Sequence, residues 1–245
     1  MALRKLIYTP SGKAGEYANR GYAANIFKGC THGCRYCYVP SFCHVTREEF
    51  HATVTVVPDM LERLQRDIGR VGVLEEPLFL CFTCDPYCID APAGITRAAI
   101  EIILNSGNRI NILTKAGMKA TKDFDLLASI PGNKIGTTLT FYLDGHTMEW
   151  EPKAAFTGFR LSMLHEAKKQ GIETWASIEP VIIPAQSLLI MEAAIPYVDE
   201  FKIGKWNHDK RANAIDWYKF VQDAVALMER HGKKYMLKNE LLKYL

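Results

Sequence analysis

Residues 95–114 read ITRAAIEIILNSGNRINILT, and they contain one expected helix followed by one expected strand. In the first half, apolar residues recur every three or four positions, which is the spacing of a helix with one buried face: Ile95, Ala98, Ala99, Ile102 and Ile103. Gly107 follows, and glycine is typical of the residue that ends a helix. Residues 109–114 are mostly apolar and predict a strand.

The same alternation continues in both directions along the chain. Extended apolar segments lie at about 22–28, 77–83, 109–114, 134–140, 173–179 and 199–204. A further helical stripe consists of Val221, Ala224, Val225 and Met228. Six strands that alternate with helices predict an α/β fold with a parallel sheet, either an open doubly wound sheet or a full or partial barrel. The functional edge of such a sheet is at the C-terminal ends of its strands.

Composition places the chain among soluble globular proteins, because 48% of its residues are hydrophobic and 23% are charged. No apolar run approaches the roughly 18 residues that span a bilayer, and the first residues lack the features of a signal peptide. We therefore expect a cytoplasmic protein with no membrane partner. The net charge is only +3, but residues 202–245 hold ten basic and five acidic residues. This basic end either contacts phosphates or is a solvated helix face.

The seven cysteines cluster in the first 88 residues, and three of them form a C-x3-C-x2-C run: Cys30, Cys34 and Cys37. An odd, clustered set in a chain without a secretory signal indicates metal or catalytic thiols. Three thiolates on one loop can hold three irons of a cubane [4Fe–4S] cluster and leave the fourth iron open for chemistry. The competing interpretation is a structural zinc site completed by Cys43 or His44, although zinc prefers ligands in two short pairs.

The other cysteines could hold a second cluster: Cys43, Cys81, Cys84 and Cys88. Cys81 and Cys84 are three residues apart on an expected strand, so alternation places them on opposite faces. We therefore predict packed thiols, with Cys84 between the sheet and the helices.

Strand alternation gives a test of the barrel interior, because successive side chains point alternately to the interior and to the helices. On each of five strands, one face carries polar residues, which are listed in chain order: Thr83, Asp85, Asn111, Lys115, Thr138, Thr140, Ser177, Glu179 and Lys202. Burial of so many polar groups is costly unless they meet a polar ligand or each other. The alternatives are thus a polar cofactor site and a ligand-free interior closed by mutual ion pairs.

The cysteine run, with the aromatic Tyr36 before its third cysteine, resembles the radical S-adenosylmethionine (SAM) enzymes. Further segments resemble the spore photoproduct lyase-like branch of that superfamily: Phe82–Tyr87, Leu113–Lys115, Gly136–Thr138 and Ser177–Pro180. The resemblance covers residues 22–207. It implies a partial TIM-type barrel of about six parallel βα units in a single domain, with an N-terminal arm at 1–21 and a C-terminal helix and basic tail at 208–245.

The resemblance also implies the chemistry. Cys30, Cys34 and Cys37 would bind a [4Fe–4S] cluster, and SAM would chelate the open iron. One electron from an external donor of flavodoxin or ferredoxin type would cleave SAM to methionine and a 5′-deoxyadenosyl radical. That radical would take a hydrogen atom from a substrate that the sequence does not identify.

Site roles combine the chemistry of the residues with the resemblance. Lys115, Thr83 and Thr138 are expected to hold the SAM carboxylate and ribose, Asp85 to pair with its amino group, and Tyr36 to lie against its adenine. The candidate catalytic residues are Tyr38, by resemblance to a tyrosine in hydrogen-atom transfer, together with Lys115 and Glu179. Glu179 and Lys202 either contact substrate or form a buried salt bridge with each other.

The chain departs from spore photoproduct lyase in one respect, because it has no cysteine after Cys88 to act as a late hydrogen donor. A nucleic-acid base or nucleoside is one candidate substrate, because the C-terminal tail is basic and because Trp150 and Trp206 could stack on a base. The alternatives are a non-catalytic nucleic-acid-binding protein with a structural zinc site and an iron–sulfur redox protein.

Overall fold

The computed structural model describes residues 5–19 and 21–245, so the first four residues and Arg20 of the expected arm lie outside the described residues. Its main sheet has eight strands in the order β1-β2-β5-β6-β7-β8-β9-β10. All neighbouring pairs are parallel except β1 with β2. The strands are β1 Ile7–Tyr8, β2 Ala23–Ala24, β5 Leu78–Leu80, β6 Ile110–Thr114, β7 Lys134–Thr138, β8 Glu173–Val181, β9 Glu200–Lys205 and β10 Lys234–Leu237.

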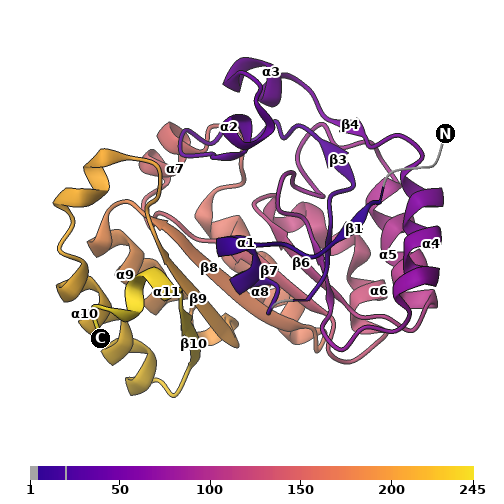
Figure 1. Cartoon of the computed structure of the whole chain (residues 1–245). Coiled ribbons are helices and arrows are strands. Elements are labelled where there is room, and N and C mark those ends of the chain that lie inside the picture. The colour runs from indigo at the N-terminus through magenta and orange to yellow at the C-terminus, as the bar shows by residue number, and fades with distance from the viewer. Residues whose placement is uncertain (1–4, 20) are drawn as a thin grey trace.

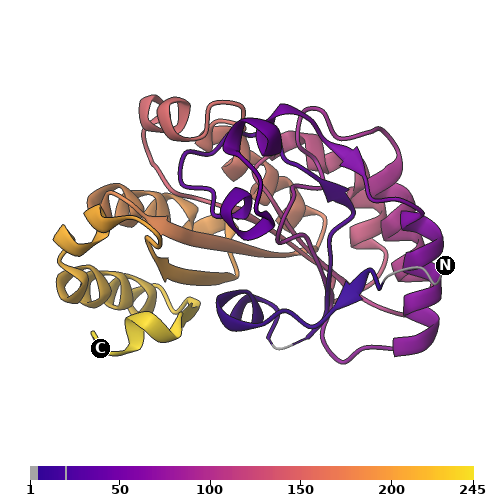
Figure 2. The same cartoon turned by 45° about the horizontal axis from the view of Figure 1, so that its top comes forward.

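Helices cover the outer face of this sheet (Figures 1 and 2). The longer ones are α4 Met60–Val71, α5 Ile95–Asn105, α8 Thr157–Lys169, α9 Pro184–Ala194 and α10 Trp217–Arg230. The chain also has shorter helices, which are not confined to this face: α1 Gly12–Tyr17, α2 Val39–Cys43, α3 Arg47–Ala52, η1 Gly117–Asp123, α6 Phe124–Ala128, α7 Asp144–Trp150, η2 Ile195–Tyr197, η3 Lys210–Ala214 and α11 Asn239–Leu242. The outward strand residues Ile112, Ile178 and Ile203 are fully buried in one continuous core with these helices.

Several expected features are confirmed. The α/β fold with one curved, mostly parallel sheet is present, and α5 begins at Ile95. Gly107 and Gly171 follow helices with φ of 81° and 76°, the left-handed conformation that a glycine cap adopts. Among the described residues, no helix is long and apolar enough to cross a membrane.

Two predicted boundaries differ from the structure. The segment expected as one strand at 22–28 is divided into β2 and β3 (Phe27–Lys28), and β3 pairs with β4 (Thr55–Val56) in a separate two-stranded sheet. The cysteine loop therefore follows this small sheet rather than the first barrel strand. The sheet also continues past residue 207, because β10 pairs in parallel with β9 through Tyr235 with Phe201 and Leu237 with Ile203.

The inner face of the sheet has its own smaller core. Tyr17, Phe79 and Trp175 pack there, and Phe82 stacks on Phe79 with ring centres 4.2 Å apart. Tyr17 comes from α1, which lies across the inner face of the sheet in Figure 1. The N-terminal arm thus fills part of the barrel interior.

Candidate functional site

The three motif cysteines lie on the loop between β3 and α2, and the short helix α3 holds this loop through its backbone. Arg47 donates hydrogen bonds to the carbonyl oxygens of Cys37, at 2.9 Å, and of Cys34. His51 Nδ1 lies 2.7 Å from the carbonyl oxygen of Cys30. All three cysteine carbonyls are therefore tied to one helix. Neither Arg47 nor His51 was predicted from the sequence as part of the site.

The loop thiols are set in a protein environment that favours their protonated form. Burial raises the pKa of the Cys34 thiol to about 12 and also raises that of Cys37. A hydrogen bond with Cys88, followed by burial, raises the pKa of Cys30, and the same bond lowers the pKa of Cys88 to about 7. Metal binding by these cysteines must therefore release protons. In the described part of the chain, no three His, Cys, Asp or Glu side chains form a group that could hold a single metal ion.

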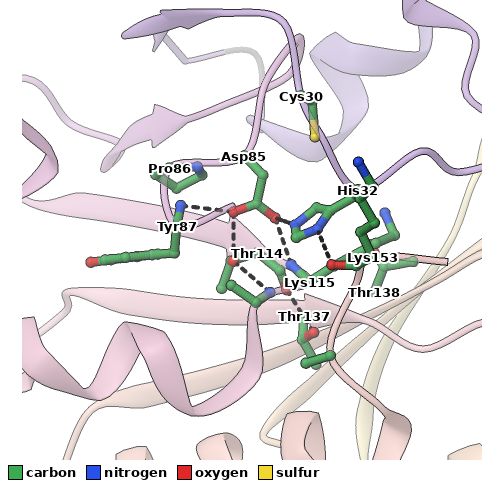
Figure 3. A network of polar contacts seen from close by, with 12 residues as sticks. Cys30, His32, Asp85, Pro86, Tyr87, Thr114, Lys115, Thr137, Thr138 and Lys153 are labelled. Carbon is green, nitrogen blue, oxygen red and sulfur yellow. Dashed lines mark hydrogen bonds and ion pairs between the residues drawn. The ribbon is translucent and has the colours of Figure 1, made fainter. Parts of the chain in front are cut away.

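Asp85 connects the cysteine loop to the end of β6 (Figure 3). Its Oδ2 lies 2.9 Å from His32 Nε2 and accepts from the Lys115 backbone N–H at 2.7 Å. Its Oδ1 accepts from the Tyr87 N–H at 2.8 Å and from the Thr114 hydroxyl at 2.7 Å. Burial alone would raise the pKa of Asp85, but His32 and the N–H donors outweigh it and lower the pKa to about 2.

This network changes the role that the structure supports for Asp85. Asp85 was expected to pair with the SAM amino group, but the residue is 6% exposed and each of its carboxylate oxygens already accepts two hydrogen bonds. The observed arrangement favours a positioning role, and the contact with an amino group stays an untested prediction. His32, inside the cysteine motif, was not predicted as part of the site.

Lys115 lies beneath the cysteine loop beside a second buried network. Its ammonium group is 5.6 Å from the centre of the Tyr36 ring. Tyr36 donates a hydrogen bond to Glu151, and Glu151 pairs with Arg160 at 2.5 Å, both side chains being 1% exposed. Burial would lower the pKa of Lys115, but electrostatic interaction with Cys34 and with the Glu151 carboxylate raises it above its ordinary value. Glu151 and Arg160 lie outside the expected strands, so the alternation of side chains along strands did not predict them as part of the site.

The donors of this region fit a cluster with an anionic ligand. Three thiols share one braced loop, and the ammonium group of Lys115 forms no hydrogen bond or ion pair with any described residue. Lys115 is half-buried, and a half-buried cation without a partner is stabilised when an anion binds beside it. Thiolates of Cys34 and its neighbours, or a carboxylate, would supply that charge.

The two hydroxyl candidates occupy different settings. Thr138 ends β7, is 2% exposed, and its carbonyl oxygen accepts from Arg160 at 2.9 Å. Thr83 lies in the turn after β5, where the Asn25 side chain accepts from its N–H at 3.0 Å. Both lie near the strand ends that carry Lys115 and Asp85, and their contact with SAM stays a prediction.

Alternation fails on the second expected strand, because β5 ends at Leu80. Phe82 turns to the inner face to stack on Phe79, whereas Cys81 joins the outer core. The prediction that Cys81 and Cys84 point to opposite faces is wrong: both belong to the outer core, and burial followed by interaction with Cys81 raises the pKa of Cys84. The packed position of Cys84 between sheet and helices is confirmed.

Alternation holds on β6 to β9, whose inner residues contact each other. Trp175 Nε1 donates to Asn111 at 2.7 Å, and the Tyr17 hydroxyl lies 2.7 Å from Ser177. The ammonium group of Lys202 donates to the Tyr17 carbonyl at 2.8 Å and lies 5.0 Å from the Trp175 ring. Burial lowers the pKa of Lys202 to about 8. The polar side chains in this part of the barrel interior thus have their partners within the protein.

Glu179 pairs with a lysine other than the expected one. Its Oε2 lies 2.8 Å from Lys238 Nζ and accepts from the Tyr17 hydroxyl at 2.6 Å, while Oε1 accepts from Asn207 at 3.2 Å. A salt bridge between Glu179 and Lys202 is not among the interactions of the described chain, so that alternative is corrected. The absence of a side chain at Gly204 provides the space for the Glu179 carboxylate, since a Cβ at position 204 would lie 2.7 Å from Glu179 Oε2.

The aromatic candidates lie at the mouth of the site. Tyr38 is 43% exposed, its hydroxyl donates to the Phe82 carbonyl at 3.3 Å, and its ring stacks on His208 with centres 6.5 Å apart. Trp206, expected as a stacking residue, is only 6% exposed and packs edge-on against Trp150. The Arg211 guanidinium lies 4.8 Å from the Trp206 ring centre. Arg211 thus already contacts the ring expected to stack on a base.

Solved structures with the same arrangement of elements are found among radical SAM enzymes. A spore photoproduct lyase variant matches with a TM-score of 0.65 at 13% identity over 88% of this chain and 75% of its own. SuiB of Streptococcus suis bound to S-adenosylmethionine matches with a TM-score of 0.63 at 10% identity, over 91% of this chain and 48% of its own. The chain has the fold of these enzymes. At such identities, the likeness concerns the fold alone.

Sequence relatives exist but carry no assigned activity. An uncharacterized protein of Acidianus two-tailed virus is 26% identical over 196 residues, and one of Methanocaldococcus jannaschii is 24% identical over 162 residues. The alignments cover 62% and 60% of those proteins, so the chain spans about three fifths of their length. No family model matches the chain.

Proposed function

We propose that this protein is a radical SAM enzyme. The observation that carries the proposal is the braced three-cysteine loop placed over the unpartnered ammonium group of Lys115. Cys30, Cys34 and Cys37 would hold a [4Fe–4S] cluster, and SAM would be the second cofactor. With an electron from a flavodoxin- or ferredoxin-type donor, the bound cofactors supply a 5′-deoxyadenosyl radical that removes hydrogen from substrate.

The protein's own residues would position SAM and supply positive charge beside it. Lys115 would attract the SAM carboxylate, since its cation is half-buried and ion pairing is stronger there than in bulk water. Tyr36 presents its ring beside Lys115, and its hydroxyl is fixed by Glu151. Thr83 and Thr138 would bind the polar groups of the ribose and methionine parts.

The substrate end of the site would lie between Tyr38 and Glu179. Tyr38 directly follows the last motif cysteine and is partly exposed, so it can approach a substrate hydrogen donor or acceptor. Glu179 is held in one orientation by Lys238, Tyr17 and Asn207, which suits a residue that positions a substrate. The roles of Tyr38 and Glu179 are part of this proposal.

Anaerobic reconstitution with iron and sulfide tests the proposal. We expect a brown protein with about four irons per chain, as the cubane requires, which forms 5′-deoxyadenosine from SAM under dithionite. The Lys115→Met variant should retain iron but bind SAM at least about tenfold more weakly, the effect of losing roughly 1.4 kcal/mol. Lys119→Met, which removes an exposed lysine close in sequence, should behave as the unaltered protein. A colourless protein with one bound zinc, or an iron-loaded protein that leaves SAM intact, would contradict the proposal.

A further inference from the structure

A cavity of about 410 Å³ lies beside the C-terminal end of β9, between η3 and α11. Its lining includes the polar residues Lys205, Asn207, His208, Asp209, Glu240 and Lys243. The volume is within the range of small-molecule sites. Asn207 joins this cavity to the inner site, because its amide donates to Glu179 at 3.2 Å.

The charges of the lining are not balanced. Asp209 is paired with Arg211 at 2.6 Å, and Glu240 is paired with Lys13 and accepts from Asn207 at 3.0 Å. Both acidic side chains are therefore already neutralised.

The two lysines of the cavity have no such partner. Neither Lys205 nor Lys243 forms an ion pair with any carboxylate in the described part of the chain. Both ammonium groups lie near the Tyr244 ring, at 5.6 Å and 5.0 Å from its centre. Two uncompensated cations at one cavity create a field that attracts an anion.

The cavity is also next to the cysteine loop. His208 lines it and stacks on Tyr38, which directly follows Cys37. A ligand that places a charged group in the cavity could thus extend past Tyr38 toward the proposed reacting centre.

We propose that this cavity binds a phosphoryl group carried by the substrate, an inference that rests on the proposed function. Lysine ammonium groups bind phosphate as point charges, and a ring N–H of His208 would add a hydrogen bond to its oxygens. The substrate class is then a phosphate ester whose reacting part lies toward Tyr38 and Glu179.

Binding of adenosine 5′-monophosphate and of inorganic phosphate to the reconstituted protein, measured by calorimetry, tests this site. We expect both to bind and adenosine to bind at least tenfold more weakly than its monophosphate. The double variant Lys205→Gln with Lys243→Gln should weaken binding of both phosphates at least tenfold. The charge-matched control, Lys169→Gln with Lys210→Gln, changes exposed lysines outside the cavity and should bind as the unaltered protein does.

The outcomes separate this inference from the proposed function. Equal phosphate binding by the two double variants, or equal binding of acetate and phosphate, would overturn the phosphoryl site. Formation of 5′-deoxyadenosine without substrate should be unchanged in the Lys205/Lys243 variant, because neither lysine is assigned to the cofactors. If the unaltered protein binds phosphate selectively but does not cleave SAM, only the proposed function is contradicted.

Discussion

Replacement of Asp85 by asparagine should destabilise the protein by an amount that its hydrogen bonds determine. The carboxylate accepts four bonds, and each oxygen receives one from a backbone N–H: Tyr87 at Oδ1 and Lys115 at Oδ2. An asparagine amide places an NH2 group where one oxygen was. The Thr114 hydroxyl or the His32 ring can rearrange to accept from it, but a backbone N–H cannot. One buried N–H therefore faces another donor in either orientation of the amide.

The cost follows from these contacts. An orphaned buried donor costs about 1–3 kcal/mol, and the remaining bonds lose their charge assistance, so Asp85→Asn should lower the free energy of unfolding by about 3 kcal/mol. Thr114→Val removes one donor to the carboxylate and also the acceptor of the Ala116 N–H, so it should cost about 2 kcal/mol, less than Asp85→Asn. Asp90→Asn, at an exposed position five residues later, should stay within about 0.5 kcal/mol.

Urea unfolding of the metal-free protein, followed by far-ultraviolet circular dichroism, gives these values for all three variants. Iron bound after reconstitution is the second measurement, because Asp85 holds His32 within the cysteine loop. We expect Asp85→Asn to bind clearly less iron than Asp90→Asn. The reasoning is refuted if Asp85→Asn and Asp90→Asn unfold at the same urea concentration, or if Thr114→Val is as costly as Asp85→Asn.

Three further predictions concern the buried lysines and the cysteine loop. Lys238→Met breaks the buried pair with Glu179 and should destabilise the protein by about 3 kcal/mol in urea unfolding, whereas exposed Lys234→Met should change little. Burial lowers the pKa of Lys202 from 10.5 to about 8, so between pH 8 and 10.5 the unfolded chain holds more protons than the folded protein, and the free energy of unfolding rises with pH. Over this range the unaltered protein should gain up to about 3 kcal/mol of stability relative to Lys202→Met. Stability curves of the two proteins that run parallel from pH 8 to 10.5 would contradict this prediction. Arg47→Met removes the donors to the Cys34 and Cys37 carbonyls and should lower iron content after reconstitution, while Arg35→Met, whose partner Glu149 is exposed, should leave it unchanged.

The sequence was sufficient where local pattern determines structure. The stripe from Ile95 predicted α5, and the alternation around Asn111, Ser177 and Lys202 placed these side chains on the inner face because β6, β8 and β9 are long enough to keep their register. The same rule failed after Leu80, since β5 has only three residues and the turn beyond it redirects Phe82 and Cys81.

The partners of the site residues could not be predicted in this way. The bonds of Asp85 with His32 and of Glu179 with Lys238 join residues that lie 53 and 59 positions apart, and no periodicity links such pairs. Arg47 and His51 act through backbone carbonyls, which one sequence cannot reveal. β10 was missed because its four residues begin with Lys234 and lie within a basic stretch.

The contact between α1 and the segment around α11 has a consequence for how the protein is made. Lys13 reaches Asn207 and Glu240, Glu16 accepts from the Asn239 N–H at 2.9 Å, and the Tyr17 hydroxyl meets Lys238 at Glu179. On a ribosome, Lys13 emerges 227 residues before Glu240, and Glu16 emerges 223 residues before Asn239. The contacts between α1 and α11 can therefore form only after synthesis has passed Glu240. Shortened chains that end after β9 should leave Glu179 exposed and the N-terminal arm unpacked.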